Sequence, residues 1–98
     1  MKIYGFFDLD LNEFVKLQFA ENDVLFRRWL QKFLQGLILE VKQNPLHPLA
    51  DLITDSSKFD VYDLGELNHK DGVIIQPDTR RIFCNLNAYV DKGDLENA

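Results

Sequence analysis

A chain of 98 residues with 46% hydrophobic and 12% aromatic residues is long enough for one folded core, and this composition excludes an intrinsically disordered protein. The single cysteine excludes an internal disulfide framework and a zinc site built on cysteine pairs, which agrees with a reducing compartment. The formal net charge of −5 comes wholly from residues 46–98, because residues 1–45 hold six acidic and six basic side chains, so an anion-binding surface is expected mainly in the first half.

The first two predicted elements form a β-hairpin. KIYGFFDL, residues 2–9, is rich in aromatic and β-branched side chains, and DLDLN supplies a polar turn before the second strand, EFVKLQFAE, at residues 13–21. In the second strand every other residue from Val15 to Phe19 is apolar. One face of that strand is therefore wholly apolar.

The next predicted element is the main helix. Asn22 is a favourable N-cap and Asp23 places a negative charge in the first turn, so a helix is predicted to start there. Apolar residues then recur at three- and four-residue steps, while basic and amide side chains gather on the opposite side. The apolar stripe consists of Phe26, Trp29, Leu30, Phe33, Leu37, Ile38 and Val41. Gly36 either ends this helix or only weakens it, and LILEV after the glycine either continues the helix or is extended.

The second half of the chain begins with NPLHPL, in which two prolines stop any helix. After the prolines the pattern predicts a short helical turn, LADLIT, and a third strand, KFDVYDLGEL. A hairpin turn, NHKDG, in which Gly72 can take positive φ, then leads to a fourth strand, GVIIQ. IFCNLNAYV is either a short final helix or another strand. These elements predict a single α+β domain over residues 1–90, in which an antiparallel sheet of about four strands, formed by two hairpins, packs on one long amphipathic helix. Residues 91–98 are predicted to be a flexible acidic tail.

The segment LFRRWLQKF, residues 25–33, interleaves basic side chains with aromatic ones, which is the composition of a nucleic-acid-binding face. Helical phase places the aromatic side chains on the buried side, away from the cations, so the segment is expected to be first of all a core helix. Its basic side is a candidate row of phosphate contacts. The candidate nucleic-acid-binding residues are Arg27, Arg28 and Lys32, with Lys16, Arg80 and Arg81 as extensions if the hairpin and the exit of the fourth strand lie nearby.

Residue types that carry catalysis or bind metals are scattered along the chain. His47 and His69 have no carboxylate at metal-ligand spacing, and Cys84 is expected to be a small core residue rather than a nucleophile. The carboxylates around the first turn and along the third strand are best explained as turn and strand-edge residues that discourage unwanted pairing. We therefore expect no enzyme, no metal and no cofactor.

Four stretches of the chain together resemble a known family. MKIYGFFDLDLNEF, FAENDVLFRRWLQKF, NPLHPLADL and FDVYDLGELNHKDGVI are similar, in order and spacing, to the small non-structural protein of gokushovirus-type microviruses, the tailless single-stranded DNA phages. The resemblance covers most of residues 1–90, with GLILEVKQ, residues 36–43, as an apparent insertion. That family is similar in genome position and size to the microvirus protein that acts when double-stranded replication gives way to single-stranded synthesis and packaging. The resemblance implies a DNA-associated or procapsid-associated role and brings no catalytic motif.

Two classes of function follow. The first is a non-enzymatic phage protein of the host cytoplasm that assists the switch to single-stranded DNA synthesis and packaging by binding single-stranded DNA. The second is a protein-interaction module, either a homodimer or an adaptor to a capsid, scaffold or host protein, which the net charge of −5 favours. A DNA mimic that inhibits a host enzyme fits the acidic half but not the family setting. No apolar stretch approaches the roughly 20 residues of a membrane span, so no membrane association is expected. A homo-oligomer, most simply a dimer, is expected because a second copy would cover apolar residues of LILEV and would double the basic row.

Overall fold

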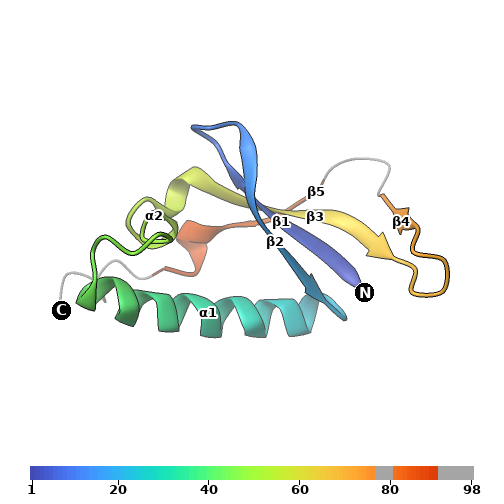
Figure 1. Cartoon of the computed structure of the whole chain (residues 1–98), viewed down its shortest axis with the longest axis horizontal. Coiled ribbons are helices and arrows are strands. Elements are labelled where there is room, and N and C mark those ends of the chain that lie inside the picture. The colour runs from blue at the N-terminus through green and yellow to red at the C-terminus, as the bar shows by residue number, and fades with distance from the viewer. Residues whose placement is uncertain (77–80, 91–98) are drawn as a thin grey trace.

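The structure, a computed structural model, describes residues 1–76 and 81–90. Its elements in chain order are β1 (Lys2–Asp8), β2 (Glu13–Ala20), α1 (Asp23–Gln43), α2 (Asp51–Thr54), η1 (Ser56–Lys58), β3 (Phe59–Leu67), β4 (Ile74–Ile75), β5 (Arg81–Asn85) and η2 (Leu86–Ala88). The strands form one curled antiparallel sheet, and α1 lies along one side of it (Figure 1). This arrangement confirms the predicted α+β class. The predicted acidic tail, residues 91–98, lies outside the described residues.

The sheet runs from β2 at one edge through β1 to β3, and the other side of β3 is shared by β5 and β4. β5 pairs with the first half of β3 and β4 pairs with its last two residues. Both predicted hairpins are present, although the second is shorter than GVIIQ suggested, because only Ile74 and Ile75 pair. Gly72 has φ +74° in the turn before β4, as predicted for a tight turn.

Helix α1 begins at the predicted cap and runs further than the sequence could establish. The Asn22 side chain accepts a hydrogen bond of 2.9 Å from the backbone N–H of Leu25. The helix continues through Gly36 to Gln43, so LILEV is helical. IFCNLNAYV, the other ambiguous segment, contains both a strand, β5, and a short 3₁₀-helix, η2. No helix among the described residues is long and apolar enough to cross a membrane.

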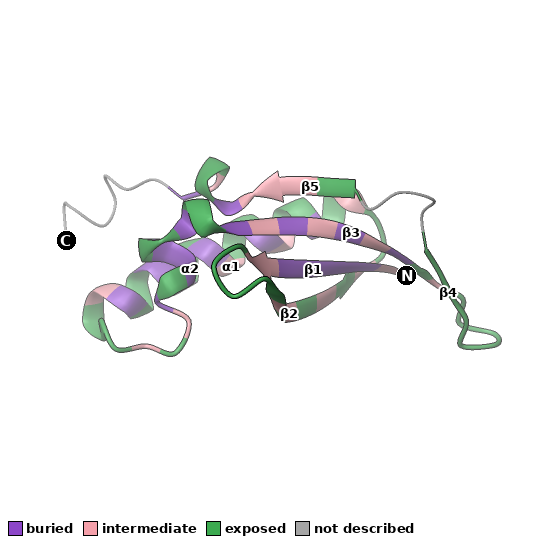
Figure 2. Cartoon of the chain, turned by 90° about the horizontal axis from the view of Figure 1, so that it is seen from above, coloured by how far each residue is buried: buried purple, intermediate pink, exposed green. Residues whose placement is uncertain are grey.

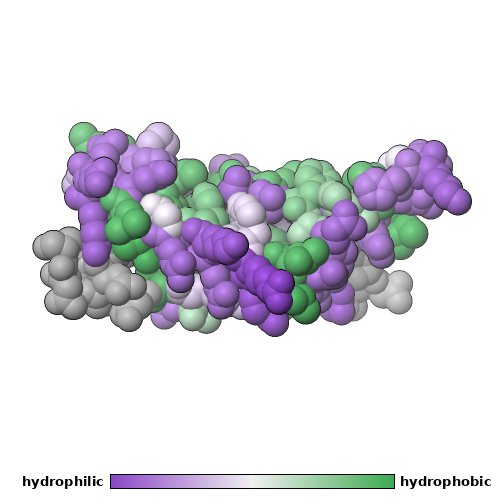
Figure 3. Space-filling model, turned by 90° about the horizontal axis from the view of Figure 1, so that it is seen from below, coloured by the Kyte–Doolittle hydropathy of each residue, from purple (hydrophilic) through white to green (hydrophobic). Residues whose placement is uncertain are grey.

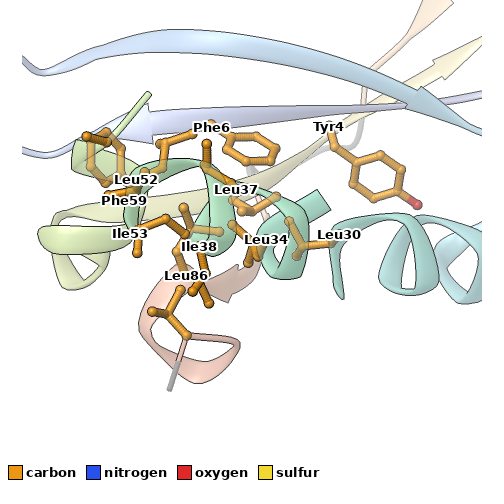
Figure 4. Close-up of a cluster of buried hydrophobic side chains, with 14 of the residues drawn as sticks. Tyr4, Phe6, Leu30, Leu34, Leu37, Ile38, Leu52, Ile53, Phe59 and Leu86 are labelled. Carbon is orange, nitrogen blue, oxygen red and sulfur yellow. The ribbon is translucent and has the colours of Figure 1, made fainter. Parts of the chain in front are cut away.

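The core lies between the sheet and α1 (Figure 4). Tyr4 and Phe6 of β1 are fully buried and point toward the helix, and the Tyr4 ring stacks on Phe26 at a centroid distance of 3.7 Å. Short elements close one end of this core, since Ile53 of α2 and Leu86 of η2 are also fully buried. The remaining large contributions come from Leu30, Leu34, Leu37, Ile38, Val41, Leu52, Phe59, Val61 and Val90. The apolar stripe of α1 therefore covers β1 and β3.

Strand β2 has the predicted alternation, but its apolar face points away from α1. Lys16 and Gln18 pair with the core residues Phe6 and Tyr4 and so lie on the helix side, whereas Leu17 pairs with Gly5 on the opposite side. Leu17 is 54% exposed and Phe19 is 47% exposed. Figure 2 shows this alternation along β2 beside the buried β1.

The centre of the outer sheet face is covered by its own side chains. A Cβ atom on Gly5 would lie 2.7 Å from both Leu64 Cδ1 and Phe14 Cδ1, so these two side chains pack directly on the backbone of β1. The Phe7 ring adds an edge contact with Phe14 at a centroid distance of 5.0 Å. The outer face is thus filled at its middle and leaves apolar surface at the β2 edge.

Candidate nucleic-acid interface

The exposed side of α1 carries cations without nearby acids of its own. Between Val24 and Leu39 the helix has three basic residues and no acidic residue. Arg28 and Lys32 are four residues apart and exposed, so they lie one above the other on the same face. Neither forms an ion pair within the part of the chain that the structure describes. Viewed from the α1 side, hydrophilic side chains gather in the middle of this face (Figure 3).

Arg27 has a different environment from Arg28. Its Nε donates a hydrogen bond of 3.1 Å to Tyr89 Oη, and its guanidinium stands over the Phe83 ring, 5.2 Å from the centroid. These contacts join α1 to the end of the described chain. Arg27 is therefore exposed yet engaged in the fold, and it lies about 100° around the helix from Arg28.

On the opposite flank of α1, Lys16 of β2 lies beside two aromatic rings. Its Nζ is 5.9 Å from the Trp29 ring centroid and 5.5 Å from that of Phe33. The two rings are stacked, with centroids 4.9 Å apart and an interplanar angle of 8°. We call Lys16, Trp29 and Phe33 the cation-aromatic site.

The rings of the cation-aromatic site are more accessible than helical phase suggested. Phe26 and Leu30 are fully buried as predicted, but Trp29 and Phe33 are only half-buried. Trp29 makes an edge contact with Phe6 at 6.3 Å and also stacks on Phe26 at 5.7 Å, so its ring is anchored in the core and Phe33 forms the outer end of the stack. The sequence signal for this site was present, since two aromatic residues at a four-residue spacing on the margin of an apolar stripe meet the surface.

Arg81 is committed to an ionic network at the start of α1. Its Nη2 binds Asp63, whose side chain is only 6% exposed. The Lys2 Nζ lies 2.7 Å from Asp23 and 3.0 Å from Asp63. Two cations thus face two carboxylates, and the Tyr4 hydroxyl donates a further hydrogen bond to Asp23. Arg81 therefore neutralises a buried acid, while Arg80 lies outside the described residues.

The network changes the titration of its members. Hydrogen bonds from Lys2 and Tyr4 lower the pKa of Asp23 below its usual value. Burial alone would lower the pKa of Lys2, but hydrogen bonds to Asp23 and Asp63 outweigh it and raise this pKa. Both groups are therefore held in their charged forms.

The histidines and the cysteine have local structural surroundings. His47 Nε2 lies 3.0 Å from Glu40 Oε2 and its Nδ1 accepts a 3.0 Å hydrogen bond from the Leu49 N–H, so it ties the proline loop to α1. Cys84 is half-buried, and burial raises the pKa of its thiol to about 11. Within residues 1–76 and 81–90 there is no group of three or more His, Cys, Asp or Glu side chains that would hold a metal ion.

The structure therefore brings Lys16 next to α1, where Lys32 lies between Trp29 and Phe33 in sequence and Arg28 directly precedes Trp29. Trp29 and Phe33 lie about 100° around the helix from Arg28 and Lys32, respectively, so a row of cations runs beside the pair of rings. Such a surface suits an anionic polymer that carries planar groups. The chain matches no protein-family model, no curated protein and no solved structure.

Proposed function

We propose that this protein binds single-stranded DNA, without catalysis, through the outer side of α1. In this proposal Arg28 and Lys32 contact phosphates, and a base stacks on Phe33, the outer ring of the cation-aromatic site, because Trp29 already stacks on Phe26 and Phe33. The observation that carries the proposal is the stacked, half-buried pair of Trp29 and Phe33 beside Lys16 and next to two cations that no acid among the described residues neutralises.

The chemistry favours single strands over duplex DNA. Bases of a duplex are already stacked and paired, whereas an unpaired base offers its flat face to an aromatic platform, which contributes about 1–3 kcal/mol per base. Each cation that neutralises a phosphate adds salt-dependent affinity through counterion release. Such binding tolerates many sequences, because every base has a flat face.

The resemblance to the small non-structural protein of gokushovirus-type microviruses supplies a setting for this activity. In that setting the protein works in the host cytoplasm, where it holds newly made single strands as genome replication gives way to packaging. The second candidate is an adaptor that binds a capsid, scaffold or host protein. The exposed apolar residues Leu17 and Phe19, together with the net charge of −5, favour it.

The test uses Trp29, which is the only tryptophan in the chain. A thymidine oligonucleotide is titrated into the protein at about 50 mM and about 200 mM salt, the range in which phosphate contacts show themselves. We expect quenching of Trp29 fluorescence, together with a rise in the anisotropy of a labelled oligonucleotide, and weaker binding at the higher salt. Absence of both signals at the lower salt contradicts the proposal and moves attention to protein partners.

Matched variants locate the binding surface. Lys32→Glu is expected to weaken binding about tenfold, equivalent to about 1.4 kcal/mol, because it replaces a phosphate contact with a repulsion. Lys70→Glu makes the same charge change at an exposed position in the β3–β4 turn and should have little effect. Arg27 is avoided because its contacts with Tyr89 and Phe83 link it to the fold. Equal losses in the two variants would show that only net charge matters.

A further inference from the structure

Strand β2 is an open edge of the sheet. It spans eight residues, Glu13–Ala20, and among the described residues it pairs only with β1. It contains no proline and only two charged side chains, and its one irregularity is a register shift at Val15, which has no partner in β1. Proteins that remain monomeric usually protect an edge of this length with prolines, several charges, β-bulges or a covering segment, and β2 has only this irregularity near its start. The regular part of the edge, residues 16–20, presents a row of backbone donors and acceptors to a further strand.

We propose that this edge pairs with β2 of a second copy of the chain, antiparallel and about a two-fold axis at Leu17. In this register Leu17 faces Leu17 of the second copy, Val15 faces Phe19, and Lys16 faces Gln18. The two sheets then continue as one. This inference goes beyond DNA binding and does not depend on it.

The side chains of β2 select this register over its neighbours. A two-fold axis at Lys16 would place two ammonium groups directly opposite each other, which is unfavourable for a cross-strand pair. An axis at Gln18 would place the carboxylate of Glu21 opposite Val15. With the axis at Leu17, Leu17 meets Leu17 and Val15 meets Phe19 on one face and Lys16 meets Gln18 on the other, while Glu13 and Glu21 face each other only at the two solvent-exposed ends of the strand pair.

The match between β2 and its own reversed sequence indicates that the strand added at this edge is β2 of a second copy of the chain. A two-fold axis requires one strand to match its own reverse, and the run from Val15 to Phe19 does so on both faces. Leu17 is 54% exposed and Phe19 is 47% exposed, so the apolar surface left by the monomer lies at this edge. A foreign strand would need no such symmetry.

The proposed dimer has a consequence for the helix side of the sheet. An axis perpendicular to the sheet leaves both copies of α1 on the same side. The two Lys16 residues become diagonal neighbours, roughly 7–8 Å apart across the strand pair. The two cation-aromatic sites then lie beside each other and form one surface. A longer oligonucleotide would span both sites, which raises the effective concentration of its second half.

The first experiment measures mass in solution. Light scattering after gel filtration, over the micromolar range, is expected to give a dimer for the unaltered chain and a monomer for Leu17→Lys, which places two charges at the axis. Ile82→Lys is the matched control, because Ile82 of β5 is also an exposed apolar residue, at 59%, on a strand remote from the β2 edge. A monomeric unaltered chain, or a dimer that Ile82→Lys disrupts and Leu17→Lys does not, overturns the proposal.

The second experiment tests the register. Leu17→Cys places two thiols in directly opposite positions, where Cα atoms about 4.5–5.5 Å apart permit a disulfide. Phe19→Cys places its two thiols four residues apart along the strand direction, about 14 Å, which is too far. Mild oxidation should therefore give a covalent dimer, mapped to position 17, only for Leu17→Cys. Equal cross-linking of both variants, or of Phe19→Cys alone, excludes this register.

The outcome for the dimer can be separated from the outcome for DNA binding. Leu17→Lys retains the cation-aromatic site, so a short oligonucleotide should still quench Trp29 in the resulting monomer. Loss of the dimer with quenching retained supports both proposals. A dimer that never quenches Trp29 leaves the interface standing and removes the proposed function.

Discussion

At the scale of single residues, Asp23 connects the start of α1 to Lys2 and Tyr4 of β1. It lies in the first turn of α1, where a negative charge is favoured by the helix dipole. It also accepts hydrogen bonds from Lys2 and Tyr4 of β1. The residue thereby holds the start of the helix against the strand beneath it. The sequence predicted Asp23 as an acid in the first turn of the helix, but it did not predict the hydrogen bonds to β1.

The lowered pKa of Asp23 predicts a loss of stability in acid. Because the pKa in the folded state lies below the unfolded value of 3.8, the stabilisation is present above that value and is lost as pH falls through the folded pKa. Asp23→Asn should lower the free energy of unfolding at neutral pH by about 0.5 kcal/mol, because the side chain is half exposed and solvent screens its ion pair, and it should flatten the decline below about pH 4. Urea unfolding followed from pH 7 to pH 3 measures both effects. Glu21→Gln, at an exposed position two residues earlier, is the control, and an equal change there would contradict this role.

At the scale of elements, the sequence predicted what local interactions determine. The start of α1 follows from Asn22 and its N-cap hydrogen bond, and the strands follow from alternation. The outer direction of Leu17 in β2 was not predictable, because alternation gives two faces and does not say which one the helix covers. The half-burial of Trp29 and Phe33 likewise depends on how far the sheet extends over α1. Both properties arise from tertiary packing.

Gly36 provides a test of the length of α1. The sequence allowed the helix to end at this residue, whereas the helix continues to Gln43. No atom outside the helix's own backbone and its neighbouring residues lies within 4 Å of the position that a Cβ would occupy. Gly36→Ala is therefore expected to raise the free energy of unfolding by about 0.5–1 kcal/mol, because alanine loses less backbone entropy in a helix.

At Gly5 in the sheet, replacement of glycine by alanine is expected to lower the free energy of unfolding instead of raising it. Gly5→Ala adds the same methyl group where Leu64 and Phe14 lie 2.7 Å away, so it should destabilise the protein. Urea unfolding of the two variants side by side gives the comparison. Destabilisation by Gly36→Ala would indicate that α1 is broken at this position in solution.

At the scale of the whole molecule, the distribution of charge matters more than its total. The net charge of −5 argued against DNA binding, and the candidate row at 27–32 argued for it. The fold places the charges that argue for and against DNA binding in different parts of the molecule. Lys2 and Arg81 neutralise Asp63, whereas Arg28 and Lys32 have no acidic partner among the described residues. Composition alone could not predict this separation, because it depends on which charges the sheet brings together.

This separation predicts different salt responses for the two proposed interfaces. Two cations, Arg28 and Lys32, contacting phosphates of a single strand give a slope of about −1.4 in log K against log salt, at about 0.7 per phosphate, so affinity should fall roughly sevenfold between about 50 mM and about 200 mM salt. The β2 dimer rests on apolar pairs and backbone hydrogen bonds, so its dissociation constant should change less than about twofold over that range. Fluorescence titration and sedimentation under matched salts measure the two constants. A dimer that weakens as steeply as DNA binding would be held by charges, and the β2 edge, whose proposed pairs bring no opposite charges together, could not then be its interface.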